Sequence, residues 1–239
     1  MNNLIPIGEA ARFLGVSIMT LRRWDTSGKL QPIKGPSRHR YYDSEALERF
    51  QSDLFSIAKL WASGDMSPKI SKDYHSETQD RFRARLEKMA IIINDEPKML
   101  GLVSLITALA GEIGNNSFDH NLGNWPDVPG VFFAFDTDKR VIVLADRGIG
   151  IKATLSRVCP NLKDDADALK VAMTEHISGR SPEQRGNGLK FVLSVATENQ
   201  IGISLQSGFA IATIDQMDGN FKIVLADHYI RGVLTKVKY

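Results

Sequence analysis

One predicted helix constrains this chain more than any other stretch, because its buried side changes from apolar to polar partway along. The helix is expected to begin at Pro97 and to continue through LVSLITALAGEIGNNSFDHN. Spacings of four, three, four and three residues place five side chains on one face: Leu105, Leu109, Glu112, Asn116 and Asp119. Burial of an unpaired carboxylate or amide costs several kcal/mol, so the polar half must meet water, a partner or a ligand. The pattern predicts a helix that packs on a sheet and lines a polar pocket.

Glycines interrupt the same helix. Gly111 and Gly114 each cost up to about 1 kcal/mol relative to alanine inside a helix. Glycine also removes side-chain bulk and lets another group approach closely. The two glycines therefore predict that another group approaches this helix closely, and a helix whose apolar stripe turns into a polar pocket wall is one economical explanation.

A strand hairpin comes after the helix in VFFAFDTDKRVIVLADRGIGI, with its turn at 136–139. The second strand ends in Asp146, and Gly148 and Gly150 come directly after it. An aspartate at a strand end can place one carboxylate in a pocket, while spaced glycines let the backbone approach a ligand.

A further glycine-rich turn precedes a predicted amphipathic helix in SPEQRGNGLKFVLSVA, where Gly186 and Gly188 lie next to the helix start. The free N–H groups and the positive dipole end of a helix N-terminus favour phosphate groups. The three stretches together predict a nucleotide or phosphate site.

The N-terminal stretch IGEAARFLGVSIMTLRRWDTSGKL predicts two short helices joined by a tight turn. Gly15 is expected to end the first helix, Ser17 to cap the second and Gly28 to close it. Leu21 and Trp24 are predicted to face the core, whereas three polar side chains project elsewhere: Thr20, Arg22 and Arg23.

A basic turn then leads into a third helix in GPSRHRYYDSEALERF, with Asp43 or Ser44 as its cap. Residues 1–50 hold eight Lys or Arg and five Asp or Glu, an excess that suggests a local polyanion contact. Two helices with a tight turn are typical of a helix-turn-helix, whose second helix enters the major groove of DNA.

The segments IGEAARFLGVS, TLRRW, SGKL and RHRYY resemble the DNA-binding domain of the MerR and excisionase-like families. The resemblance implies that Thr20, Arg22 and Arg23 face duplex DNA. It also implies that a basic wing grips phosphate through Arg38, Arg40 and Tyr41. The rest of the chain does not look like a MerR effector domain.

The body of the chain resembles the GHKL superfamily of ATPases, above all its histidine-kinase-like members. The resemblance rests on E-x-x-x-N-x-x-x-H in the helix, D-x-G-x-G after a strand and R-G-x-G-L before a helix. It implies that Glu112 orients water, that Asn116 holds Mg²⁺ and that Asp146 accepts a proton from the adenine amino group. The other implied ATP-binding residues are Asp119, Gly148, Gly150, Arg185, Gly186, Gly188 and Lys190.

Three positions depart from the superfamily pattern. Lys190 replaces a common glycine and is expected either to contact phosphate or to project outward. Arg147 stands where asparagine is common, and Gly232-Val233 stands where the superfamily has glycine and threonine. Thr213 and Thr235 are the two candidates to supply the missing hydroxyl. ATP binding is therefore better supported than hydrolysis.

We expect an α+β chain: a small all-α winged helix-turn-helix followed by a two-layer α/β sandwich of the Bergerat type. The expected ranges are 1–63 for the DNA-binding domain, 64–76 for a linker and 77–239 for the ATP-binding domain, with a lid at 151–185. A single cysteine, Cys159, excludes an intramolecular disulfide and favours the cytoplasm. No apolar run approaches the roughly 20 residues of a membrane-spanning helix.

The favoured function is a homodimeric DNA-binding regulator in which Mg-ATP switches DNA or partner binding. A protein kinase on the same fold is the alternative. A histidine kinase needs a phosphoacceptor histidine on an exposed dimerisation helix, and His75 is the candidate before the ATPase-like region. The sequence is also compatible with a serine kinase acting in trans and with a DNA binder whose nucleotide fold is inactive.

Overall fold

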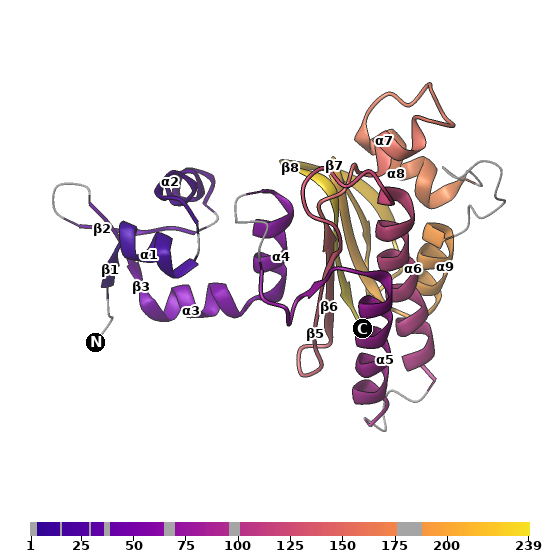
Figure 1. Ribbon diagram of the computed structural model, residues 1–239, viewed down its shortest axis with the longest axis horizontal. Coiled ribbons are helices and arrows are strands. Elements are labelled where there is room, and N and C mark those ends of the chain that lie inside the picture. The colour runs from indigo at the N-terminus through magenta and orange to yellow at the C-terminus, as the bar shows by residue number, and fades with distance from the viewer. Residues whose placement is uncertain are drawn as a thin grey trace. The chain divides into compact units, whose positions relative to one another are not determined.

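The chain divides into two compact units, Met1–Ile70 and Ser71–Tyr239. The structure is a computed structural model that describes residues 4–14, 16–28, 30–35, 39–64, 70–95, 101–175 and 188–239 (Figure 1). Each unit has its own apolar core, so each is described by itself.

The first unit contains four helices and a small sheet among its described residues. Its elements are β1 (Leu4–Pro6), α1 (Ile7–Leu14), α2 (Ile18–Ser27), β2 (Ile33–Lys34), β3 (Arg40–Asp43), α3 (Ser44–Ser52) and α4 (Leu54–Ala62). The strands pair antiparallel in the order β1-β3-β2. The expectation of an all-α unit is therefore wrong, because β1 adds a third strand to the hairpin of β2 and β3.

The core of the first unit collects apolar residues from α1 to α4. The buried members are Ala10, Ala11, Leu14, Leu21, Trp24, Tyr42, Leu47 and Leu60. Trp24 packs its ring 5.5 Å from the ring of Phe50. The prediction that Leu21 and Trp24 face the core is confirmed.

The second unit places helices against one face of a five-stranded sheet (Figure 1). Its elements are β4 (His75–Ser76), α5 (Gln79–Asn94), α6 (Val103–Asn121), β5 (Val131–Asp136), β6 (Val141–Asp146), α7 (Ile151–Leu155), α8 (Asp165–Thr174), α9 (Gly188–Glu198), β7 (Gly202–Ile214) and β8 (Phe221–Lys238). The strand order is β4-β5-β6-β8-β7, and all neighbouring pairs are antiparallel. The predicted hairpin is confirmed as β5 and β6.

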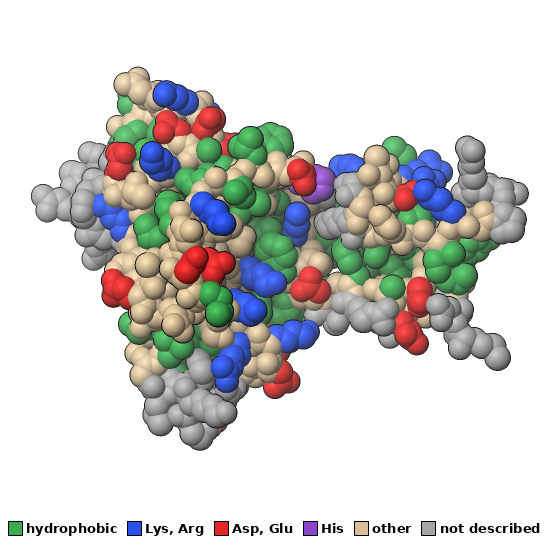
Figure 2. Space-filling view, turned by 180° about the vertical axis from the view of Figure 1, so that it is seen from behind, with side chains coloured by type: hydrophobic (Ala, Val, Ile, Leu, Met, Phe, Trp, Pro, Cys, Tyr) green, Lys and Arg blue, Asp and Glu red, His purple; other side chains and the backbone are tan. Residues whose placement is uncertain are grey.

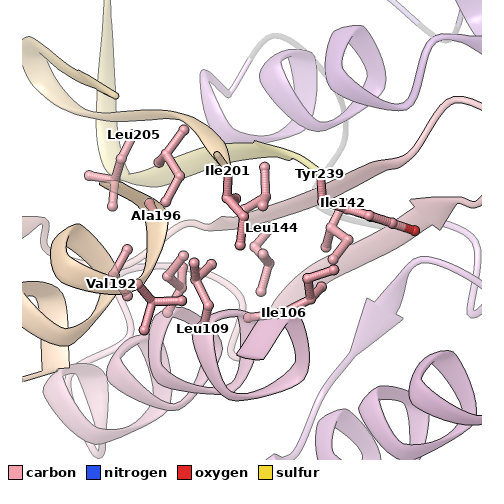
Figure 3. Packing of buried hydrophobic residues seen from close by; sticks show 14 of the residues in the cluster. Ile106, Leu109, Ile142, Leu144, Val192, Ala196, Ile201, Leu205 and Tyr239 are labelled. Carbon is pink, nitrogen blue, oxygen red and sulfur yellow. The ribbon is translucent and has the colours of Figure 1, made fainter. Parts of the chain in front are cut away.

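The core of the second unit lies between the sheet and its helices. Figure 3 shows Ile106 and Leu109 of α6 facing Ile142 and Leu144 of β6, with Ala196 of α9 beside them. Because alternate residues of a strand face one side, this side of β6 also carries Asp146, at the end of the strand.

The two glycines of α6 serve helix packing. A Cβ atom added to Gly114 would overlap the ring of Phe82 on α5, and one added to Gly111 would lie 3.2 Å from Leu86 Cδ2. Phe82 is fully buried and meets Phe133 edge to face, with 5.3 Å between ring centroids. The expected close approach at these glycines is therefore confirmed, and the group that approaches is helix α5.

Arg85 of α5 fastens the start of the second unit to the sheet. Its guanidinium donates to the carbonyl oxygens of Asp73 and Phe133, and to Ser76 Oγ at 3.3 Å. β4 pairs with β5 through His75 opposite Phe132. Residues 71–76 thus belong to the second unit rather than to the expected linker.

Helices in the second unit begin and pack differently from the sequence prediction. α6 begins at Val103 rather than at Pro97, which lies outside the described residues. In the expected lid, α8 buries Leu169 and Met173 in the main core. The part of 151–185 that forms α8 is therefore a packed helix of the domain.

None of the helices that the structure describes is both long enough and apolar enough to cross a lipid bilayer.

Replacing Gly114 by alanine should destabilise the second unit. The added methyl group overlaps a buried ring, and overpacking of this kind typically costs about 1–3 kcal/mol. Urea unfolding monitored by circular dichroism would measure the loss. Gly111→Ala is the matched control, because only the end of the flexible Leu86 side chain must move. Equal stability of Gly114→Ala and the parent would contradict the packing described for α5 and α6.

Candidate functional site

Helix α2 is held in place by caps at both ends. Ser17 Oγ accepts the backbone N–H of Thr20 at 3.0 Å, and Gly28 ends the helix with a φ of 72°. Both predicted caps are confirmed; Gly15, the predicted end of the preceding helix, lies outside the described residues. The caps define where the exposed face of α2 begins.

The exposed face of α2 agrees with the prediction at its two arginines and differs from it in the first turn. Arg22 and Arg23 are exposed, as expected, whereas Thr20 is only 8% exposed. The Thr20 hydroxyl lies 2.9 Å from Ser17 Oγ, within the N-terminal cap. The expectation that Thr20 projects outward is wrong because its side chain is used to begin the helix. Ile18 and Met19, which sequence reasoning passed over, are exposed beside the arginines.

Asp25 ties α2 to both strands of the wing. Its carboxylate accepts Arg40 Nε at 2.7 Å and lies 3.7 Å from Lys34 Nζ. Arg40, expected to grip phosphate, thus joins β3 to α2. Tyr41 is half-buried opposite Ile33 in the wing. Arg38 lies outside the described residues.

In the second unit, Asp146 is fully buried and surrounded by hydrogen-bond donors. Its carboxylate accepts Ser117 Oγ at 2.7 Å and the Gly148 N–H at 2.8 Å. Burial raises the pKa of the Asp146 carboxyl, while the bonds from Ser117, Gly148 and the Val233 backbone oppose that rise. A Cβ atom added to Gly232 would overlap this carboxylate, so β8 approaches it closely.

Helix α6 carries Glu112 and Asn116 to the first residue of α9. A Cβ atom added to Gly188 would lie 2.8 Å from Glu112 Oε2 and 3.1 Å from Asn116 Nδ2. All three residues are partly exposed, as is Lys190 in the first turn of α9. The structure thus brings together residues that the sequence separates by more than 70 positions.

The loop after Asp146 is held by Asn121, a residue that sequence reasoning missed. Asn121 Oδ1 accepts the Ile149 N–H at 2.8 Å, and its Nδ2 donates to the Ser117 carbonyl at 2.7 Å. A Cβ atom on Gly148 would overlap the Asn121 amide. Gly150 has a φ of 83°, a conformation that favours glycine.

An ion cluster beside this loop was also missed. Asp127 accepts Arg147 Nε at 2.8 Å and Nη2 at 2.5 Å, and lies 3.1 Å from Arg231 Nη2. Arg231 Nη2 also donates to the Arg147 carbonyl at 3.0 Å. Burial raises the pKa of the Asp127 carboxyl, but the bonds from Arg147 and Val128 and the two arginine charges outweigh it, so the pKa lies below its usual value.

The remaining predicted residues are less informative. Asp119 is exposed on α6, and Arg185 and Gly186 lie outside the described residues. Thr213 Oγ1 donates to the Lys222 carbonyl near the turn of the β7–β8 hairpin. Thr235 is 0% exposed on β8, opposite Leu144, and its hydroxyl has no hydrogen-bond partner among the residues that the structure describes.

A protein-only metal cage is absent from the part of the chain that the structure describes. No group of three or more His, Cys, Asp or Glu side chains is placed there to hold an ion. Mg²⁺ does not need such a cage, since it is commonly held by one or two protein oxygens, substrate phosphates and water.

Comparison with known proteins bears on the first unit. Residues 6–42 match the MerR family regulatory protein family, a range that includes α1, α2 and the wing. The match supports a DNA-binding helix-turn-helix in this part of the chain. A type II methyltransferase of Escherichia coli, M.Eco47II, is 41% identical over 71 residues, or 29% of this chain. The chain matches only about a sixth (16%) of the length of that curated relative.

Asp127→Asn should lower the stability of the second unit at neutral pH by about 1–3 kcal/mol, because buried donors of Arg147 lose their ionised acceptor. The folded pKa of Asp127 is depressed, so its contribution exists above the unfolded value and disappears as pH falls through the folded value. Urea midpoints from about pH 3 to pH 7 should therefore converge for variant and parent at acid pH. Asp138→Asn, in the exposed β5–β6 turn, is the control. A difference independent of pH would contradict the ionic role.

Proposed function

We propose that this chain is a DNA-binding regulatory protein whose second unit binds Mg-ATP in a GHKL-type site. The observation that carries the proposal is the convergence of three separate motifs on α6. Ser117 of that helix holds Asp146, and Glu112 and Asn116 lie against Gly188. Burial raises the pKa of the Asp146 carboxyl, and groups with a perturbed pKa gather at functional sites.

The DNA-binding half of the proposal rests on the match over residues 6–42 and on the exposed arginines of α2. Helix-turn-helix units gain specificity by pairing two half-sites, so we propose that two copies of the chain bind together. We assign no methyl transfer to the chain, because its similarity covers 16% of the methyltransferase.

The proposed ligand of the second unit is an adenine nucleotide. Gly188 and Gly232 let the backbone approach Glu112 and Asp146 more closely than any residue with a Cβ atom could, and the buried Thr235 hydroxyl lacks a partner among the described residues. When bound, Mg-ATP would supply an adenine amino group, a triphosphate and the cation. Asp146 would accept a hydrogen bond from the amino group, and the Asn116 amide oxygen would be a ligand of the cation.

Glu112 would hold the water that attacks the terminal phosphate, because its carboxylate lies beside the first residue of α9. The N-terminal N–H groups of α9 would face the phosphates, where the helix dipole favours negative charge. Asn121, Asp127 and Arg147 would act as positioning residues, since they hold the loop that comes after Asp146.

The histidine-kinase alternative is less well supported by the position of His75. Its Nε2 lies 3.0 Å from the Pro129 carbonyl oxygen, and the residue pairs with Phe132 in the sheet. A phosphoacceptor histidine must be accessible to a nucleotide-binding domain, whereas His75 is half-buried in a strand. Assays that follow phosphate transfer to added protein would reveal a kinase that acts in trans.

Asp146→Asn should weaken adenine-nucleotide binding by at least about 1.4 kcal/mol, a tenfold loss. Glu112→Gln, of nearly the same size, should preserve binding and abolish any hydrolysis. Calorimetric titration with ATP and Mg²⁺ would measure binding, and phosphate release would measure turnover. Glu87→Gln, exposed on α5, is the control. Binding and turnover equal to the parent in both site variants would exclude this nucleotide site.

Arg22→Ala and Arg23→Ala should weaken duplex binding and reduce its dependence on salt, because a chain that makes fewer phosphate contacts releases fewer counterions when it binds. Fluorescence anisotropy at several salt concentrations would give the slopes. Arg83→Ala removes the same charge from α5 of the other unit and should leave the slope unchanged. A parent chain that binds no duplex even at low salt would refute the helix-turn-helix function.

If ATP is a switch, binding of ATP and of DNA must be reciprocally coupled, typically by about 5- to 150-fold. DNA is titrated with and without a non-hydrolysable ATP analogue, and the analogue is then titrated with and without DNA. The two ratios should agree. If the analogue leaves the DNA affinity unchanged and DNA leaves the analogue affinity unchanged, the units are only tethered.

A further inference from the structure

Two apolar side chains are exposed in the first turn of α2. Ile18 is 42% exposed and Met19 is 69% exposed, although both come directly after the Ser17 cap. Single exposed apolar residues are ordinary on protein surfaces. Here two neighbours are exposed at the start of the second helix of the region that matches the MerR family, and the proposed function places this helix on DNA.

The fold leaves these side chains no place in the core. The opposite side of α2 supplies Leu21 and Trp24 to the core of the first unit, and Thr20 is buried in the cap. Because residues three and four apart share a helix face, Met19 lies beside Arg22 and Arg23. On the visible face of the smaller body in Figure 2, hydrophobic and Lys or Arg side chains lie next to each other.

A surface that combines apolar groups with arginines suits one part of duplex DNA. Arginines contact the phosphates, and the C5-methyl group of thymine is the apolar group on the base edges of the major groove. Methionine and isoleucine have no hydrogen-bond donor for guanine and no strong acceptor for cytosine. Facing a G·C pair, they would remove polar base atoms from water without replacing their hydrogen bonds.

We propose that Met19, supported by Ile18, determines sequence specificity by contacting a thymine methyl group. This inference rests on the proposed DNA-binding function and adds to it the base that is read and the kind of contact. Arg22 and Arg23 position the helix on the backbone, whereas the apolar pair selects an A·T pair in one orientation. Thr20, the residue that sequence reasoning assigned to this surface, takes no part.

The experiment begins with selection of duplexes from a randomised pool by the full-length chain. Thymines in the enriched sequence are then replaced one at a time by deoxyuridine, which removes only the methyl group. At the contacted position the parent should lose about fourfold in affinity, the factor expected for one buried methyl-sized group. Met19→Ala should bind the thymine and deoxyuridine duplexes equally.

Controls separate this outcome from misfolding and from nonspecific effects. Alanine is the best helix former, so Met19→Ala should retain the helix content of the parent. Met217→Ala, in an 87% exposed position between β7 and β8, should retain the full methyl effect. Equal affinity of the parent for all thymine and deoxyuridine duplexes would overturn the proposal. So would a Met19→Ala variant that keeps the methyl effect, or one that instead loses self-association or binding to another protein.

Failure of the inference can be distinguished from failure of the proposed function. If the parent chain binds duplex DNA but shows no methyl effect, the DNA-binding function stands and only the role of Met19 is refuted. A parent chain that binds no duplex at all removes both.

Discussion

The hydrogen bond from Ser117 to Asp146 is the interaction on which the second unit depends. A carboxylate with no exposure is tolerated only when its oxygens meet donors, so Ser117, Gly148 and the Val233 backbone must converge on it. The bond joins α6 to the end of β6, and the same helix carries Glu112 and Asn116, which lie beside Gly188 at the start of α9. Phe82 of α5 also positions this helix, since its ring takes the space that a side chain at 114 would need.

Helix caps and the strand hairpin were predicted correctly from the sequence. Ser17 and Gly28 cap α2, Asp43 caps α3, and the hairpin of β5 and β6 turns where its polar residues predict. Each depends on backbone preferences within a few residues. The position of Glu112 beside Gly188 was predicted only through resemblance, because periodicity within one helix does not indicate which distant segment lies against it.

The errors arise where burial depends on tertiary partners. Thr20 was assigned to solvent by helical spacing, but its hydroxyl is used by the neighbouring cap. Gly111 and Gly114 predicted the close approach of another group, but only the structure identifies that group as helix α5. Asp127, Arg147 and Arg231 come from three separate segments, and pairing among charges so far apart leaves no periodic signal in a single sequence.

The position of β8 has a consequence for the order in which the protein is made. β8 lies between β6 and β7, yet it is the last strand in the sequence, and its pairs with β6 join residues about 90 positions apart. The first unit emerges from the ribosome before any of this sheet is complete. Gly232, which lies against Asp146, is translated 86 residues after it. A nascent chain therefore completes its N-terminal unit while the surroundings of Asp146 are still being synthesised.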